Sequence, residues 1–275
     1  MRIVRVLLLA AVLAAIGNPI LLYFLQEKLL FQPLPVNEGQ RAVLRRFAAV
    51  EELTLAGEGG TKLHGWYQRA AGSGKAPLIL YFGGNSEDVS YLPSSADRVP
   101  GWSLAVFEYR GYGMSEGEPG EQALFADALA IHDTFARREE IDARRIVVMG
   151  RSLGTGVATY VASQRPVLAA VLVTPYDSIL HVASDKFWFA PVAWILRHRF
   201  ESVALAQRMR HPAFFLVAGE DEEIPPHYAL ALYEQWGAPK RWHVFRGEGH
   251  NTIDAAPDYW TRIADFLAYE SGRAQ

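Results

Sequence analysis

The sequence predicts an α/β protein with a mostly parallel, eight-stranded sheet that carries helices on both faces. Short, continuously apolar segments alternate with helical patterns from about residue 48 onward. Continuously apolar strands are typical of parallel sheets, because helices cover both faces of such sheets. The chain has 275 residues, half of them hydrophobic, and this is enough to bury the core of one large domain.

The expected strands leave room for a helix between most neighbours. Residues 53–56 and 63–68 are separated by a glycine-rich turn, so they should pair with each other. Residues 122–136 repeat apolar side chains at helical spacing and predict a helix with one buried face. The other strands are expected at residues 77–82, 103–109, 146–149, 169–174, 213–218 and 241–245.

A long connection follows the strand at residues 169–174. Residues 177–212 are too many for one crossover helix, and they include the aromatic run Phe187, Trp188 and Phe189. We expect a small helical cap there, at the edge of the sheet where the strands end. The alternative is a helix packed on the domain core, since aromatic clusters are usually buried.

The N-terminal segment predicts a membrane anchor. Residues 6–25 carry no charge, and twenty such residues span the hydrocarbon core of a bilayer. We therefore expect residues 1–27 to form a single-pass anchor, residues 28–47 a linker, and residues 48–275 a domain outside the cytoplasm. A cleaved signal peptide is the alternative for the first segment.

Composition excludes several classes of function. The net charge is −3 with no block of basic residues, which argues against a nucleic-acid partner. The chain has no cysteine, so disulfides, thiolate metal sites and a cysteine nucleophile are ruled out. Because it also has no phosphate-binding loop, dinucleotide fingerprint or His-Glu-x-x-His pattern, we expect neither a cofactor nor a metal.

The clearest chemical motif is Gly150-Arg151-Ser152-Leu153-Gly154. It directly follows the predicted strand at residues 146–149, and a helical pattern begins at Leu153. A strand, a sharp turn and a helix in this order form a nucleophile elbow, which holds a serine hydroxyl above the sheet. We therefore predict that Ser152 is a nucleophile. The alternative is an ordinary tight turn.

A serine hydroxyl needs a base, and the base needs an orienting acid. In elbow-type sites the acid and then the histidine follow the serine along the chain. His250 follows the last strand, and Asp221 follows the strand at residues 213–218. Asp177, after the preceding strand, is a rival for the acid. Alternatively, the acidic residues 220–223 could simply cap the N-terminus of the next helix.

The oxyanion of an acyl-transfer reaction needs two backbone N–H donors. One should be the N–H of Leu153, next to the nucleophile. The other should come from Asn85, in the loop Gly83-Gly84-Asn85-Ser86 that follows the strand at residues 77–82. Glycines in that loop allow the backbone to approach a substrate closely.

From about residue 28 the chain resembles the α/β-hydrolases, and in particular a group of membrane-anchored serine hydrolases that includes depalmitoylase-like α/β-hydrolase-domain proteins. The resemblance implies an α/β-hydrolase fold and a Ser152–Asp221–His250 triad that hydrolyses carboxylic esters or thioesters of small-molecule or lipid-like acyl groups. Gly83 stands where that group usually has histidine. The matching segments are residues 30–33, 107–117, 150–156, 175–178, 219–221 and 249–251.

Two other functions remain open on the sequence. A serine peptidase on the same fold would use the same triad, since acyl transfer to water is common to both reactions. A membrane-anchored scaffold protein would have the same fold but an inactive remnant of the catalytic site. The full set of Ser152, Asp221 and His250 argues against the scaffold.

Overall fold

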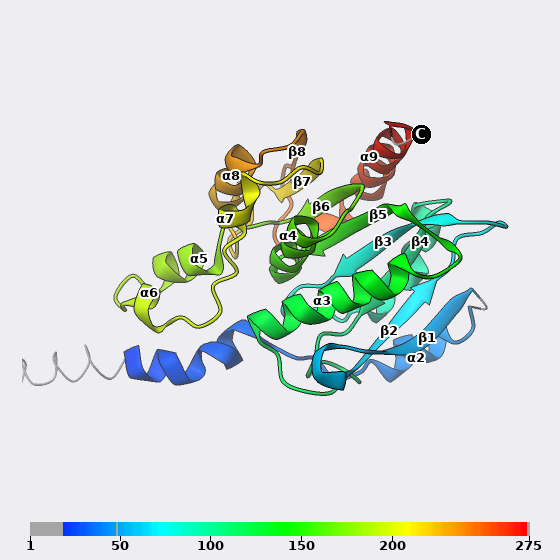
Figure 1. Cartoon of the computed structure of the whole chain (residues 1–275). Helices are drawn as coiled ribbons and strands as arrows, with labels where there is room; N and C mark the ends of the chain where they lie inside the picture. Colours follow the sequence, from blue (N-terminus) through cyan, green and yellow to red (C-terminus); the bar gives the residue numbers. More distant parts are fainter. Residues whose placement is uncertain (1–18, 48, 274–275) are drawn as a thin grey trace, which may run out of the picture.

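An eight-stranded sheet runs through the middle of the protein (Figure 1). The computed structural model describes residues 19–47 and 49–273. The strands are β1 (Val50–Ala56), β2 (Lys62–Gln68), β3 (Ala76–Phe82), β4 (Ser103–Phe107), β5 (Ile141–Arg151), β6 (Ala169–Val173), β7 (Ala213–Ala218) and β8 (Lys240–Phe245). Their order across the sheet is β1-β2-β4-β3-β5-β6-β7-β8, with β2 antiparallel to both its neighbours and all other pairs parallel. The predicted sheet is confirmed.

Helices cover both faces of this sheet, as predicted (Figure 1). Side chains from α3, α4, α7 and α8 pack with Leu78 and Leu80 of β3, whereas α2, η2 and α9 pack with Ile79 and Tyr81. Successive residues of a strand point to opposite faces, so β3 supplies both cores. The helices are α2 (Glu38–Leu44), α3 (Glu121–Ala136), α4 (Leu153–Gln164), α5 (Ile179–Lys186), α6 (Val192–Ile195), α7 (Ser202–Ala206), α8 (Pro226–Gln235) and α9 (Tyr259–Arg273), with the 3₁₀ turns η1 (Glu58–Gly60), η2 (Val89–Arg98) and η3 (Ile253–Ala255).

Strand β5 is longer than the sequence pattern predicts. It begins at Ile141, which pairs with Ala76 of β3, and the register shifts before the regular ladder resumes. The added residues include the charged Asp142, Arg144 and Arg145, and Arg145 donates to Asp142 at 2.8 Å. The continuously apolar part of the strand starts only at Ile146, and an apolar pattern reflects burial rather than backbone pairing.

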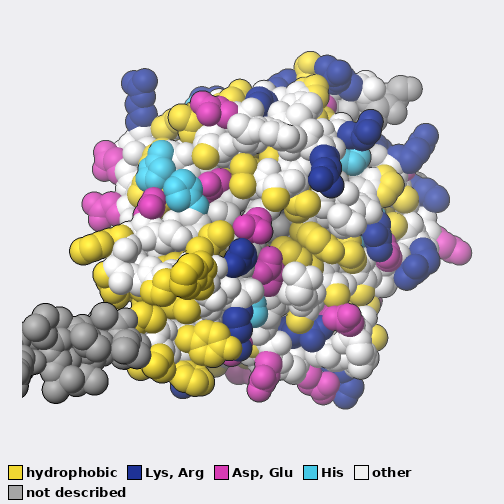
Figure 2. Space-filling model, turned by 60° about the vertical axis from the view of Figure 1, so that its left-hand side comes forward, with side chains coloured by type: hydrophobic (Ala, Val, Ile, Leu, Met, Phe, Trp, Pro, Cys, Tyr) yellow, Lys and Arg dark blue, Asp and Glu magenta, His cyan; other side chains and the backbone are white. Residues whose placement is uncertain are grey.

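The segment predicted as the cap, residues 177–212, contains the short helices α5, α6 and α7. Its aromatic side chains divide between two environments. Phe187 lines a cavity, whereas Trp188 and Trp194 are 82% and 90% exposed. Figure 2 shows hydrophobic side chains gathered on this side of the molecule. The aromatic-rich stretch therefore does not face the domain core as one unit.

The predicted localisation needs correction. Among the residues that the structure describes, no helix is long and apolar enough to cross a membrane. Residues 19–30 are helical, and we call this segment the N-terminal helix; at 1.5 Å per residue these described residues span about 18 Å. It includes Glu27 and Lys28, and its Gln26 is buried against the cap. The prediction of a single-pass anchor with an extracytoplasmic domain is therefore wrong. Residues 1–18 of the predicted anchor segment lie outside the described part of the chain.

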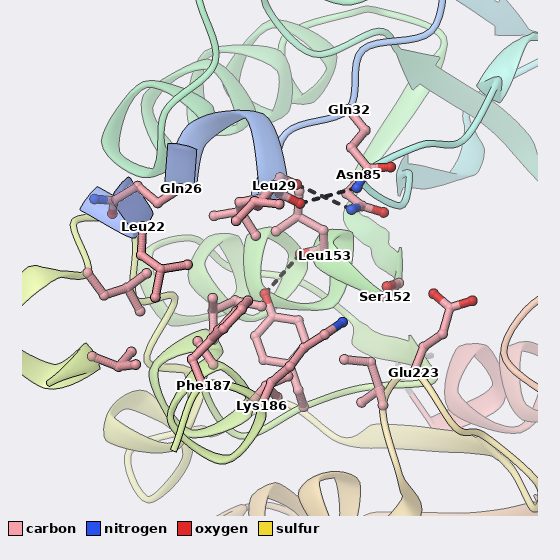
Figure 3. A pocket seen from close by; sticks show the side chains of 18 of the residues that line it. Leu22, Gln26, Leu29, Gln32, Asn85, Ser152, Leu153, Lys186, Phe187 and Glu223 are labelled. Atoms are coloured by element: carbon pink, nitrogen blue, oxygen red, sulfur yellow. Dashed lines mark hydrogen bonds between the residues drawn. The ribbon is translucent and has the colours of Figure 1, made fainter. Parts of the chain in front are cut away.

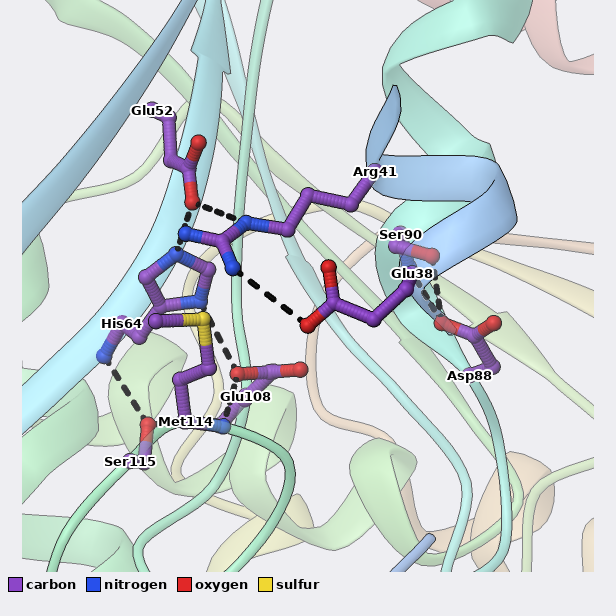
Figure 4. Close-up of polar contacts among 9 residues, drawn as sticks. All are labelled: Glu38, Arg41, Glu52, His64, Asp88, Ser90, Glu108, Met114 and Ser115. Atoms are coloured by element: carbon purple, nitrogen blue, oxygen red, sulfur yellow. Dashed lines mark hydrogen bonds and ion pairs between the residues drawn. The ribbon is translucent and has the colours of Figure 1, made fainter. Parts of the chain in front are cut away.

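A partly buried ionic cluster connects the elements at the antiparallel edge of the sheet (Figure 4). His64 of β2 lies between two carboxylates, with Nδ1 2.9 Å from Glu108 Oε2 and Nε2 2.8 Å from Glu52 Oε1. Arg41 of α2 donates to the same oxygen of Glu52 at 2.6 Å. Burial lowers the pKa of His64, but the hydrogen bonds that its ring makes to Glu108 and Glu52, together with the charges of these carboxylates, outweigh burial, so the pKa is raised overall. The cluster joins β1, β2, α2 and the loop after β4.

Candidate active site

Ser152 lies at the turn between β5 and α4. Its backbone has φ 50° and ψ −121°, a conformation that a residue with a side chain rarely adopts and that costs about 1–3 kcal/mol. A Cβ on Gly150 would collide with the carbonyl oxygen of Gly154, and one on Gly154 would collide with the carbonyl oxygen of Phe82. Only glycine therefore fits at positions 150 and 154, and the strand, turn and helix have the geometry expected of a nucleophile elbow.

The structure brings Ser152, His250 and Asp221 together. His250 follows β8, and its Nε2 lies 2.9 Å from Ser152 Oγ. Its Nδ1 lies 2.8 Å from Asp221 Oδ2, in the loop after β7. A carboxylate accepts hydrogen bonds and does not donate them, so Nδ1 carries the proton and Nε2 accepts from the serine hydroxyl. This tautomer leaves Nε2 free to take a proton from Ser152.

Asp221, rather than Asp177, is the acid that contacts His250. Asp221 is buried, and its second oxygen accepts from the N–H groups of Glu223 at 3.0 Å and Ile224 at 2.7 Å. Asp177 is bonded instead to the Nδ1 of His181 at 2.7 Å. Although acids and histidines gather here, no three or more of them in the described part of the chain are arranged to hold a metal ion.

Asn85 and Leu153 both line the cavity that opens on Ser152 (Figure 3). Leu153 is the first residue of α4, and the first N–H groups of a helix have no partner within it. The carbonyl of Asn85 accepts from the hydroxyl of Tyr112 at 2.9 Å, and that of Gly83 accepts from Tyr109 at 2.8 Å. Two tyrosines therefore hold this loop in place, although Gly83 has no side chain of its own.

Glu87 and Arg151 connect the loops around Ser152, and the sequence analysis missed both roles. Glu87 accepts from the N–H of Gly84 at 2.7 Å, and its other oxygen accepts from Tyr81 at 2.7 Å. Arg151 lies 3.7 Å from Glu87 and donates to the carbonyl of His250 at 3.1 Å. Burial lowers the pKa of Arg151, but the charge of Glu87 outweighs it and raises the pKa overall. Arg151 occupies one of the two variable positions of the elbow motif, so the motif does not predict this contact.

The cavity beside Ser152 has a volume of about 330 Å³. This is at the lower end of the range of small-molecule sites, which is about 300–1,000 Å³. Most of its lining is aliphatic or aromatic, and its charged residues are Lys186 and Glu223, both exposed. The site therefore has a polar reacting end at Ser152 and an apolar interior.

A sheet of this order, with a strained serine where β5 meets α4, defines an α/β-hydrolase. The chain belongs to that family, whose model, described as the alpha/beta hydrolase fold, matches residues 77–204. It is 30% identical to the alpha/beta hydrolase domain-containing protein WAV2 of Arabidopsis thaliana, over 79% of this chain and 78% of that protein. It is 27% identical to the alpha/beta hydrolase domain-containing protein 17C of Xenopus tropicalis, over 82% and 72% of the two chains.

A solved structure with the same fold is the esterase Pf2001 of Pyrococcus furiosus. It matches with a TM-score of 0.67 at 17% identity, covering 87% of this chain and 98% of that chain. A likeness at this identity shows the fold and leaves the substrate open. The predicted resemblance to α/β-hydrolase-domain proteins is confirmed by the two sequence relatives, and family membership supports a hydrolase.

Proposed function

We propose that the protein is a serine hydrolase that cleaves carboxylic ester or thioester bonds through an acyl-enzyme. The observation that carries this proposal is the position of His250, within hydrogen-bond distance of both Ser152 Oγ and Asp221 Oδ2. A strained serine with a base and a buried acid in line is the arrangement that activates a hydroxyl for attack.

In this mechanism Ser152 Oγ attacks the acyl carbon while His250 Nε2 takes the hydroxyl proton. The N–H groups of Leu153 and Asn85 stabilise the oxyanion of the tetrahedral intermediate. His250 then gives its proton to the departing alkoxide or thiolate, and the acyl group stays on Ser152. A water molecule, deprotonated by His250, attacks the acyl-enzyme; His250 returns the proton to Ser152 Oγ as the carboxylic acid is released. Asp221 holds the ring in the correct tautomer and stabilises the imidazolium.

The cavity favours small esters and thioesters over peptides. Its aliphatic and aromatic interior suits an acyl chain, whereas a peptide backbone would bring polar groups that need partners there. A serine peptidase on this fold is therefore the second candidate. A panel of acyl esters, acyl thioesters and peptides separates the two, and faster turnover of the peptides would favour the peptidase.

Labelling with a fluorophosphonate probe tests the serine directly. We expect the wild-type chain to be labelled and the Ser152→Ala variant to remain unlabelled, with mass spectrometry placing the adduct on Ser152. Equal labelling of both proteins would place the reactive group elsewhere. A folded wild-type protein that takes up no probe would favour a scaffold without catalytic activity.

A further inference from the structure

The cavity beside Ser152 has one wall made by the N-terminal helix. Leu22, Gln26 and Leu29 of this helix line the cavity together with residues of the cap (Figure 3). These three positions are spaced four and three residues apart, so they lie on one face of the helix. In Figure 3, Leu22 lies at the end of the cavity away from Ser152, and Leu29 lies between them.

The N-terminal helix is attached to the cap by polar contacts of defined geometry. Gln26 is only 8% exposed; its Nε2 donates to the carbonyl of Ile195 at 3.1 Å, and its Oε1 accepts from the N–H of Arg197 at 2.7 Å. Glu27 pairs with Arg197 at 3.1 Å, and the Arg197 guanidinium lies 5.1 Å from the ring centre of Tyr23. A buried amide with satisfied partners sets the position of the helix, because displacing it would leave polar groups unpaired.

Leu21 and Phe24 of the same helix do not line the cavity. Leu21 is 56% exposed and Phe24 is 70% exposed. The helix therefore presents its apolar side chains in two directions, and only one of them leads to Ser152. This division separates residues that can contact a bound substrate from residues that cannot.

We propose that the N-terminal helix is part of the substrate-binding site and that Leu22 determines the length of the acyl chain that the enzyme accepts. This proposal rests on the proposed esterase or thioesterase function. The carbonyl is placed by Ser152 and the oxyanion donors, and the exposed Lys186 and Glu223 give the cavity a polar side. The alkyl chain consequently extends into the apolar part, toward the N-terminal helix and the cap.

Filling the far end of the cavity tests the proposal in the full-length chain. In Leu22→Trp we expect kcat/KM for p-nitrophenyl octanoate to fall about tenfold or more, since contacts of single methylenes in a pocket are worth about ten- to two-hundredfold. The value for p-nitrophenyl acetate should stay within about twofold, because a short acyl chain does not reach this residue. The matched control is Leu21→Trp, which adds the same ring to the exposed face and should change neither value.

A binding measurement separates failure of this proposal from failure of the esterase function. In the Ser152→Ala background we expect a fluorescent fatty acid to bind, and Leu22→Trp, but not Leu21→Trp, to weaken its binding. If the fatty acid binds in this way but the wild type hydrolyses no ester, the esterase function is overturned, and the role of the N-terminal helix in binding the acyl chain stands. If the wild type hydrolyses esters and Leu22→Trp leaves the ratio of kcat/KM for octanoate to kcat/KM for acetate unchanged, the proposed role of Leu22 is overturned. Leu22→Phe serves as the variant if the tryptophan substitution prevents folding, which circular dichroism reports.

Discussion

The backbone of Ser152 shows how neighbouring residues hold a conformation that the serine alone would avoid. Positive φ is costly for a residue with a side chain, and here it is maintained by hydrogen bonding on both sides. The N–H of Ser152 donates to Val173 of β6 at 2.9 Å, and its carbonyl accepts from the N–H of Thr155 at 2.9 Å. These contacts aim the hydroxyl at His250 before any substrate arrives, which supports its proposed role as nucleophile.

If Asp221 is the acid of the triad, its replacement should cause a large loss of activity. Replacing Asp221 with Asn keeps the size of the side chain but lets the amide donate to Nδ1, which favours the wrong tautomer of His250. We expect kcat to fall about 10³- to 10⁴-fold on an ester substrate. Asp177→Asn is the matched control and should stay near wild type. If Asp177→Asn were damaging and Asp221→Asn mild, the acid would be assigned to the wrong residue.

Glu87 should act as a positioning residue. Its carboxylate accepts from Gly84 N–H, Tyr81 and Tyr91 and lies near Arg151. In Glu87→Gln one acceptor oxygen becomes an amide donor, so the oxyanion loop should shift relative to Ser152. We expect kcat to fall about ten- to a hundredfold, because small misplacements near a reacting group are costly, while KM changes little. The exposed Glu139→Gln is the control, and an increase in KM alone would contradict this role.

At the scale of elements, the edge of the sheet depends on the charge of His64. Its folded pKa is raised by Glu108 and Glu52, so protonation contributes stability that is complete below the unfolded pKa of about 6.5. That contribution is lost as the pH rises through the folded pKa. The cluster thus connects β1, β2 and the loop after β4 most strongly at mildly acidic pH.

Denaturant unfolding at several pH values tests this linkage. We expect the free energy of unfolding of the wild type to exceed that of His64→Gln most at about pH 6, and the excess to shrink as the pH rises. Each unit by which the folded pKa is raised corresponds to about 1.4 kcal/mol. His227→Gln is the control at an exposed position of α8. An excess that stays constant with pH would show that His64 contributes by packing rather than by charge.

The whole molecule is stabilised by two apolar cores, one on each face of the sheet. Leu172 of β6 is fully buried in the core beneath α3 and α4. Leu172→Ala should lower the free energy of unfolding by about 2–5 kcal/mol, because it removes buried methyl groups and leaves a cavity. Leu230→Ala, at a position 44% exposed, should change it by less than about 0.5 kcal/mol. Urea unfolding measures both, and equal losses would contradict this view of the core.

The fold was predictable because its signals are local. An apolar strand, a glycine-flanked serine and a helical repeat are each contained in a short segment, as residues 146–164 show. The order of Ser152, Asp221 and His250 along the chain likewise placed each candidate after a strand of a parallel sheet, and such loops meet at one edge. Chain order therefore identified the loops that come together without any knowledge of distances.

Features that depend on contacts between distant segments of the chain became visible only in the tertiary structure. The choice between Asp221 and Asp177 required the distance to His250, and the contacts of Glu87 and Arg151 join loops that are far apart in the sequence. The N-terminal helix is the clearest case. Its apolar residues suit a lipid or a protein pocket equally well by composition, and the hydrogen bonds of Gln26 to the cap place its described part against the protein. Apolar composition measures the tendency to leave water, whereas the partner is set by geometry.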